Sequence, residues 1–208
     1  MAELELIGAP FSNYVRALRI LCEEKGVAYK LTPVRPHTPE VTSIHPAGQI
    51  PCLRHGDVAV FESQAIATYI DKAFAGAKFI PEDAEGAAYT TQWISYGNVK
   101  VDRWIMREFV VPTAFADKVK GPDTARINAA IPEIEKCLST LQAAVAKGGY
   151  LAGNALTFAD MNIVPMLATF GQFPQGTATL AKYPGLGAYM AKLTARPSYV
   201  NTAPPPRA

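Results

Sequence analysis

The first group of residues that could support chemistry places a hydroxyl where a strand gives way to a helix. Ser12 follows residues 8–11, which interrupt an alternating polar and apolar segment over residues 3–7, and it precedes apolar residues at helical spacing. A helix start carries unpaired N–H groups and a positive potential, so it favours an anion, including a thiolate. Ser12 is therefore either the simple N-cap of its own helix or a hydroxyl placed to stabilise an anion.

A second group surrounds a proline that opens a short strand. In the segment His45-Pro46-Ala47-Gly48-Gln49-Ile50-Pro51-Cys52-Leu53, Pro51 follows a tight loop and is a candidate for a cis peptide bond. A cis Ile50–Pro51 bond would turn the Ile50 N–H and C=O away from the sheet, where they could pair with an extended peptide like an added strand. The alternative is an ordinary trans proline at the start of a strand.

The third group is a Glu-Ser pair directly before a helix. Glu62 and Ser63 offer a carboxylate, a hydroxyl and exposed helix-start amides within one small patch. That patch could hold an amino acid by both ends, with Glu62 on the ammonium and with Ser63 and the amides on the carboxylate. A simple Ser63 N-cap is the alternative.

The elements that must position these groups alternate between strand and helix. We predict strands over residues 3–7, 27–34, 50–53 and 58–61, helices over 12–25 and 63–74, and a loop over 35–48 with room for one helical turn. The strand-helix-strand start predicts a right-handed crossover, and the turn at residues 55–57 predicts an antiparallel hairpin. Residues 1–76 should therefore form an α/β domain with a mixed sheet.

The second half of the chain has a different pattern. A segment over residues 77–86 has the composition of a linker, and strand signals fade after it. Helical spacing predicts helices over 87–118, 124–147, 158–170 and 184–195, so residues 87–208 should form an all-helical domain. Three consecutive prolines in the segment 203–208 cannot continue a helix, and we expect that tail to fray.

Composition excludes several classes of protein. A hydrophobic fraction of 49% with a net charge of +2 excludes a disordered polyelectrolyte and disfavours nucleic-acid binding. No apolar run reaches the roughly 18 residues of a membrane-spanning helix, and the acidic start does not resemble a secretory signal, so we expect a cytoplasmic protein. Cys22, Cys52 and Cys137 form no C-x-x-C pair and are expected to be reduced thiols. Three loop histidines without helical pairing predict no metal site.

The three groups, in this order and spacing, are similar to the first domain of the cytosolic glutathione transferases, most of all the phi-type and related bacterial members. The matching segments are Ser12 with Arg16, residues 37–40, residues 45–51 and residues 61–66. In the second half the matching segments are residues 150–154, residues 156–160 with a variant capping box of Thr157 and Asp160, and Ala195-Arg196-Pro197. The chain departs from the pattern at His45 in place of Asn, at Gln64 in place of Arg, and at Thr38 near the place of a Lys.

This resemblance implies a thioredoxin-like domain followed by a helical bundle, and the activity of a glutathione transferase. Glutathione, γ-Glu-Cys-Gly, would be the co-substrate, with no further cofactor. Ser12 would donate a hydrogen bond to its sulfur and favour the thiolate, which attacks a small hydrophobic electrophile. The residues that correspond to the family's glutathione contacts are His37, Gln49, Ile50, Pro51, Glu62 and Ser63.

Among these contacts, Glu62 and Ser63 would hold the γ-glutamyl end and the Ile50 backbone, set by Pro51, would pair with the cysteinyl residue. Gln49 and His37 would support the peptide and its glycine carboxylate. The family also implies a homodimer. Candidates for the second-substrate pocket are Phe11, Trp104, Arg107 and Phe109, although an aromatic-rich helix is more typical of ordinary core and dimer packing. Peroxidase activity and conjugation both stay open.

Two other functions fit parts of the sequence. A non-catalytic carrier or interaction module can use the same fold, but such proteins often lose the glutathione contacts that are present here. A thiol-disulfide enzyme would need a nucleophilic cysteine where this chain has Ser12, and Cys52 beside Pro51 is the only residue that keeps this reading open.

Overall fold

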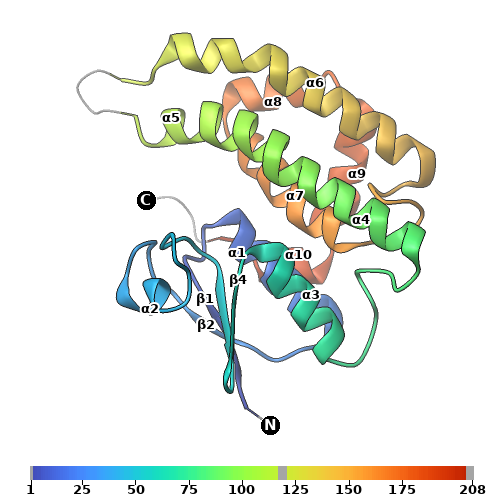
Figure 1. Cartoon of the computed structure of the whole chain (residues 1–208). Helices are drawn as coiled ribbons and strands as arrows, with labels where there is room; N and C mark the ends of the chain where they lie inside the picture. Colours follow the sequence, from blue (N-terminus) through green and yellow to red (C-terminus); the bar gives the residue numbers. More distant parts are fainter. Residues whose placement is uncertain (1, 117–120, 205–208) are drawn as a thin grey trace. The chain divides into compact units, whose positions relative to one another are not determined.

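The computed structural model describes residues 2–116 and 121–204, and contacts within the chain divide it into two units (Figure 1). The first unit holds the residues up to Glu82 together with the segment that starts at Ala195, and the second holds Asp83–Thr194. The expected boundaries, 1–76 and 87–208, differ from these at the linker and at the C-terminal end. Residues 205–208 of the expected frayed tail lie outside the described residues.

The first unit contains a four-stranded mixed sheet, as predicted. Its strands are β1 (Leu4–Ile7), β2 (Lys30–Thr32), β3 (Cys52–His55) and β4 (Val58–Phe61), in the spatial order β2-β1-β3-β4. β1 runs parallel to β2 and antiparallel to β3, and β3 with β4 forms the predicted hairpin. β3 begins two residues later than expected, after Pro51, which has no N–H to donate to a ladder.

Each face of the sheet is covered by a different set of helices (Figure 1). Leu4, Leu6 and Leu53 are buried on one face, against α1 (Asn13–Lys25) and α3 (Ser63–Ala73). On the other face Ile7 and Cys52 pack with α2 (Pro39–Thr42), the single helical turn that the loop had room for. The alternation along β1 therefore buries both faces of the strand.

A short helix near the C-terminal end, α10 (Pro197–Asn201), completes the first unit by packing on α1. The Glu24 carboxylate accepts hydrogen bonds from Arg196 through both of its oxygens at 2.6 Å, and Oε1 also accepts from the hydroxyl of Ser198. Arg16 donates from α1 to the carbonyl of Tyr199 at 3.0 Å. These bonds explain why the chain beyond Ala195 belongs to the first unit.

Replacing Glu24 with Gln should destabilise the protein in a pH-dependent way. Burial of the Glu24 carboxyl acts to raise its pKa. The opposite effect of the hydrogen bonds from Arg196 and Ser198, together with the charge of Arg196, is larger, so the pKa lies below its ordinary value. The carboxylate therefore contributes stability above the unfolded pKa of about 4.3 and loses it as the pH falls through the folded pKa. Urea unfolding at neutral pH should show a loss of about 1.5–3 kcal/mol for Glu24→Gln.

That difference between the variant and the wild type should shrink below a pH of about 4, where the wild-type carboxyl protonates. Glu40→Gln is the matched control, because Glu40 is an exposed carboxylate near the start of α2 without an ion pair among the described residues. A Glu24→Gln deficit that stays constant from neutral to acidic pH would contradict the assigned charge interaction.

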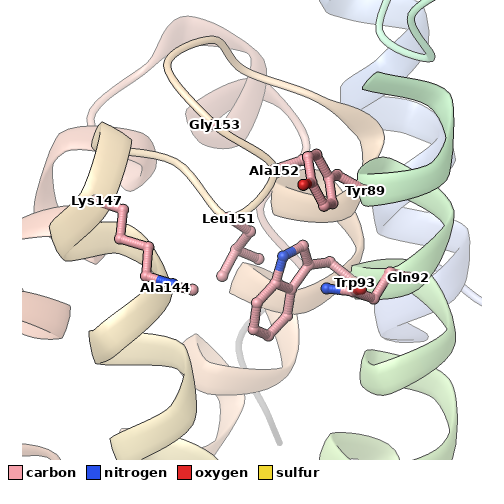
Figure 2. Close-up of a pocket in the computed structure, with 8 residues that line it drawn as sticks. All are labelled: Tyr89, Gln92, Trp93, Ala144, Lys147, Leu151, Ala152 and Gly153. Carbon is pink, nitrogen blue, oxygen red and sulfur yellow. The ribbon is translucent and has the colours of Figure 1, made fainter. Parts of the chain in front are cut away.

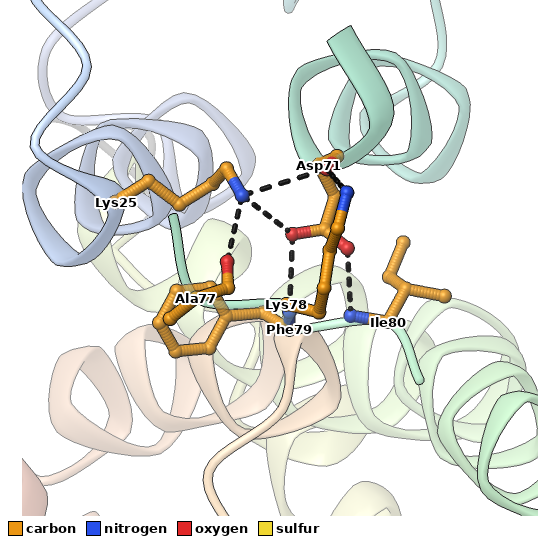
Figure 3. Close-up of polar contacts among 6 residues, drawn as sticks. All are labelled: Lys25, Asp71, Ala77, Lys78, Phe79 and Ile80. Carbon is orange, nitrogen blue, oxygen red and sulfur yellow. Dashed lines mark hydrogen bonds and ion pairs between the residues drawn. The ribbon is translucent and has the colours of Figure 1, made fainter. Parts of the chain in front are cut away.

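A buried ion pair ties the end of α1 to the end of α3 (Figure 3). The Lys25 ammonium lies 3.1 Å from Oδ1 of Asp71, with side chains 0% and 2% exposed, and it also donates to the carbonyl of Ala77. The Asp71 carboxylate accepts the N–H groups of Phe79 and Ile80 as well. One carboxylate thus fixes both helices and the chain segment that follows α3.

The second unit is all-helical in its described part. Its helices are α4 (Ala84–Tyr96), η1 (Gly97–Val110), α5 (Val111–Ala114), α6 (Thr124–Gly148), α7 (Phe158–Phe170), α8 (Pro174–Leu180) and α9 (Pro184–Thr194). The expected linker over 77–86 is shortened because the Asp83 side chain caps α4 by accepting the Gly86 N–H at 2.7 Å. The expected helix over 87–118 is a continuous run from α4 to Ala114, and its middle part, η1, is π-helical.

The core of the second unit is α7, nearly all of whose residues are buried. Its capping box is present as predicted, since Asp160 accepts the Thr157 N–H at 2.9 Å. Asp160 also accepts from the Tyr189 hydroxyl at 2.6 Å and from the Leu151 N–H, so it joins α7, α9 and the loop before α7. None of the described helices combines the length and the apolar character needed to cross a bilayer.

Candidate functional site

The register of the sheet brings the three groups identified in the sequence to one end of the first unit. Ile7 at the end of β1 pairs with Cys52, and Cys52 pairs with Phe61 at the end of β4. Three segments therefore lie at the same end of the sheet, which are the loop before α1, the proline before β3 and the Glu-Ser pair after β4. This juxtaposition allows the three groups to form a single candidate site.

Ser12 is both the N-cap of α1 and part of this edge. Its hydroxyl oxygen accepts the Val15 N–H at 3.4 Å, a long capping bond, and the hydroxyl hydrogen is left to donate elsewhere. Gly8 lets the loop before Ser12 approach the second group, because a Cβ there would lie 2.6 Å from Val15 Cγ2 and 3.1 Å from Ile50 Cβ. The capping and anion-stabilising readings of Ser12 are thus compatible.

The segment around Pro51 has the backbone expected of a peptide-binding edge. The Ile50–Pro51 peptide bond is cis, as the sequence indicated. Among the described residues, no hydrogen-bond partner engages the Ile50 N–H or C=O. Both groups are consequently available to an extended ligand.

His37 lies against the same loop. Its N–H donates to the Gly48 carbonyl at 2.8 Å, and a Cβ at residue 48 would collide with the His37 imidazole, so only glycine fits there. The imidazole of His37 and the side chain of Gln49 are both exposed. They can therefore reach a ligand without displacing protein contacts.

Glu62 and Ser63 form the third side of the site. Glu62 has a positive φ of 69°, an uncommon conformation for a residue with a side chain, and no side-chain bond to its own helix. Its side chain is 64% exposed, while Ser63 is buried at the first turn of α3. The first N–H groups of α3 lack helical acceptors, so the patch combines anion-binding amides with one carboxylate.

His45 is a member of this site that the sequence interpretation missed. Its Nε2 lies 3.5 Å from Oε1 of Glu62, its ring packs on Phe61 with a centroid separation of 4.7 Å, and the residue is only 5% exposed. In the sequence it was noted only as a departure from the family pattern. No spacing rule links residues 45 and 62, because they meet through the geometry of two loops.

The three cysteines are free and buried. Burial raises the pKa of Cys22 to about 12 and that of Cys52 to about 11, and it also raises the pKa of Cys137. A thiol held in its neutral form is a poor nucleophile, so Cys52 does not support a thiol-disulfide enzyme. No group of three His, Cys, Asp or Glu side chains within residues 2–116 and 121–204 is placed to hold a metal ion.

The residues expected to line a second-substrate pocket have different environments. Phe11 is 62% exposed in the first unit. In η1, Phe109 is buried and makes an edge contact with Phe170 at 4.8 Å between centroids, Trp104 lies under the Arg103 guanidinium, and Arg107 donates to Asp102 at 2.9 Å. Phe109 therefore packs in the core of the second unit.

A pocket of about 290 Å³ lies within the second unit, and its lining includes none of those η1 residues (Figure 2). Tyr89, Gln92 and Trp93 of α4 form one wall, and Ala144 and Lys147 of α6 form another. The loop residues 151–153 complete the lining. No local sequence pattern indicates this pocket, because its residues come from three separated segments. A molecule there would meet two aromatic rings and one ammonium group.

Comparison with known proteins identifies the relatives of the whole chain. Residues 6–78 match the family model for the glutathione S-transferase N-terminal domain, and residues 104–197 match that for the C-terminal domain. Glutathione S-transferase 3 of Zea mays is 32% identical over 99% of this chain and 98% of its own length. Elongation factor 1-gamma of Prunus avium is 31% identical, over 68% of this chain and 34% of that protein. The structure of maize glutathione S-transferase I with an atrazine glutathione conjugate superposes with a TM-score of 0.85 at 26% identity, covering 97% and 96% of the two chains.

Proposed function

The chain belongs to the glutathione S-transferase family, and we propose that it is an enzyme that transfers the thiol sulfur of glutathione to an electrophilic, hydrophobic molecule. The observation that carries this proposal is the convergence of Ser12, the Ile50–Pro51 segment and the Glu62–Ser63 pair at one edge of the sheet. Each group suits a different part of the tripeptide.

Glutathione would bind along this edge by groups that the protein leaves available. Glu62 would pair with the γ-glutamyl ammonium, while Ser63 and the first amides of α3 would receive its carboxylate. The Ile50 N–H and C=O would pair with the cysteinyl backbone as a neighbouring strand does. Gln49 and His37 would support the remaining peptide and the glycine carboxylate.

Catalysis would consist of making the bound thiol a thiolate. The Ser12 hydroxyl donates its hydrogen to the sulfur, and the α1 N-terminus adds a positive potential, so the proton leaves to solvent at a lower pH. Each unit of lowered pKa corresponds to about 1.4 kcal/mol in favour of the thiolate. With an aryl halide, the sulfur lone pair forms the new C–S bond and halide departs with the electrons of the broken bond. Ser12 itself stays covalently unchanged.

Other properties of the enzyme follow the family pattern and are part of the same proposal. By the family pattern, the candidate contacts of the electrophile are Phe11, Trp104, Arg107 and Phe109. Glutathione is the only co-substrate proposed, and reduction of hydroperoxides is a second reaction open to the same thiolate. The enzyme would act as a cytoplasmic homodimer.

Replacing Glu62 with Gln tests the proposed binding mode. Loss of the charged acceptor should raise the dissociation constant for glutathione roughly ten- to hundredfold, since hydrogen bonds to charged groups contribute about 1.5–3 kcal/mol. Isothermal titration with glutathione measures this effect, and turnover of chlorodinitrobenzene measures the activity. Asp57→Asn, in the turn at the opposite end of the hairpin, should leave both unchanged.

The result also separates the enzyme from a non-catalytic module. A wild-type protein that binds glutathione but conjugates no aryl halide, haloalkane, isothiocyanate or hydroperoxide would favour a carrier. Absence of any glutathione binding would leave only the fold in common with the family, and an interaction module would replace the proposal.

A further inference from the structure

The imidazole of His45 is buried beside the expected glutathione contacts, although it belongs to none of them. It is 5% exposed, and its backbone is fixed by bonds from its N–H to the Val41 carbonyl and from the Gly48 N–H to its own carbonyl. The ring packs on Phe61, directly before Glu62. A buried imidazole that packs on Phe61 above a fixed backbone has little freedom to change its orientation.

The hydrogen-bond pattern determines which ring nitrogen faces the carboxylate with a hydrogen. The Ala47 N–H donates to Nδ1 at 3.1 Å, so Nδ1 of the neutral ring must be the acceptor. The ring hydrogen then lies on Nε2, 3.5 Å from Oε1 of Glu62. The ring N–H of His45 therefore lies near one oxygen of an otherwise exposed carboxylate, at a distance slightly longer than an ordinary hydrogen bond.

Glu62 needs such a restraint. It is 64% exposed and has no bond to its own helix, so its long side chain would otherwise lose rotamer freedom when a ligand binds. Among the described residues, its second carboxylate oxygen has no hydrogen-bond partner. The donor on His45 can hold one oxygen while the other accepts from an ammonium group.

We propose that His45 is a positioning residue for glutathione, which holds the Glu62 carboxylate in place for the γ-glutamyl ammonium. This inference rests on the proposed function. It connects two parts of the proposed glutathione site. The loop over residues 45–48 leads to Ile50, which would bind the cysteinyl residue, and His45 in that loop contacts Glu62, which would bind the γ-glutamyl end. His45 touches Glu62 and not the reacting sulfur, so its effect should fall on glutathione affinity and on KM and not on kcat.

The test compares glutathione with glutaryl-Cys-Gly, the same tripeptide without the α-amino group. The wild type should prefer glutathione by about tenfold or more, because only glutathione offers Glu62 an ammonium. A residue that merely supports the loop would change the affinity for both ligands equally. A residue that positions Glu62 changes the preference between them.

Two substitutions separate these roles. His45→Asn keeps an acceptor near the position of Nδ1 for the Ala47 N–H but is too short to reach Glu62, whereas His45→Gln keeps a donor near the position of Nε2. We expect His45→Asn to reduce the preference at least about threefold and His45→Gln to retain most of it, with kcat at saturating glutathione close to wild type in both. His55→Asn and His55→Gln are matched controls, because His55 contacts Tyr69 and Ala2 at the other end of β3.

The outcomes are distinguishable. A reduced preference in His45→Asn that His45→Gln restores supports the inference. Equal preference in the two variants, whether kept or lost, overturns it while the proposed function stands. Wild-type protein that binds neither tripeptide overturns the proposed function, and the inference falls with it.

Discussion

Replacing Ser12 with Ala should reduce kcat for glutathione conjugation by roughly 10²-fold, the size of effect seen when one preorganised donor to a developing anion is removed. In the proposed binding mode the Ser12 hydroxyl donates to the sulfur. Affinity for glutathione should change little, because the γ-glutamyl and backbone contacts remain. The ultraviolet absorbance of the thiolate against pH, in wild type and Ser12→Ala, measures the cause directly.

Ser12 also caps α1, so the variant needs a stability control. Loss of an N-cap costs about 1 kcal/mol, and the capping bond here is long at 3.4 Å. Ser43→Ala is a matched hydroxyl deletion, since the Ser43 hydroxyl, at the C-cap of α2, donates to the Glu40 carbonyl within the same turn. An unshifted thiol pKa in the wild-type complex, or the same shift in Ser12→Ala, would show that Ser12 is a cap and no more.

Replacing Asp71 with Ala should strongly destabilise the first unit. It leaves the buried Lys25 ammonium without its carboxylate and removes the acceptor of the Phe79 and Ile80 N–H groups. Removing one partner of a buried ion pair typically costs about 3–5 kcal/mol. Chemical denaturation of the ligand-free protein measures the loss.

Replacing the other partner of the ion pair, Lys25, is the informative comparison. Lys25→Met removes the ammonium but leaves Asp71 with two backbone donors, so it should cost less than Asp71→Ala. Lys72→Met, an exposed lysine next to Asp71 on α3, should change stability by less than about 0.5 kcal/mol. Equal losses for Lys25→Met and Asp71→Ala would mean that the carboxylate acts only through the ion pair.

Local patterns in the sequence were sufficient for the sheet. The alternation in β1, the helical spacing of α1 and the turn between β3 and β4 each reflect interactions within a few residues. The cis peptide before Pro51 and the capping box of α7 were indicated in the same way. Some boundaries differ from the predicted ones by a few residues. Helix α4, for example, begins at Ala84 and not at residue 87, because the Asp83 side chain caps it.

Features that depend on distant segments were missed. His45 meets Glu62 only after two loops have taken their shapes, and neither residue is unusual in its local window. The bonds between Arg196 and Glu24 join residues 172 positions apart. A periodic pattern of apolar residues therefore cannot predict that α10 belongs to the first unit. The π-helical form of η1 cannot be predicted from the spacing of an α-helix. Residues five apart, such as Asp102 and Arg107, meet there instead of residues four apart.

The return of α10 to α1 has a consequence for how the protein is made. A ribosome releases the chain from its N-terminal end, and domains tend to fold as they emerge. The sheet and α3 are complete after Phe74, but Arg196 and Ser198 emerge only after all of Asp83–Thr194. Helix α1, which Ser12 caps, therefore packs against α10 only late in synthesis. In a nascent chain halted before Arg196, the Glu24 carboxylate would lack its donors Arg196 and Ser198.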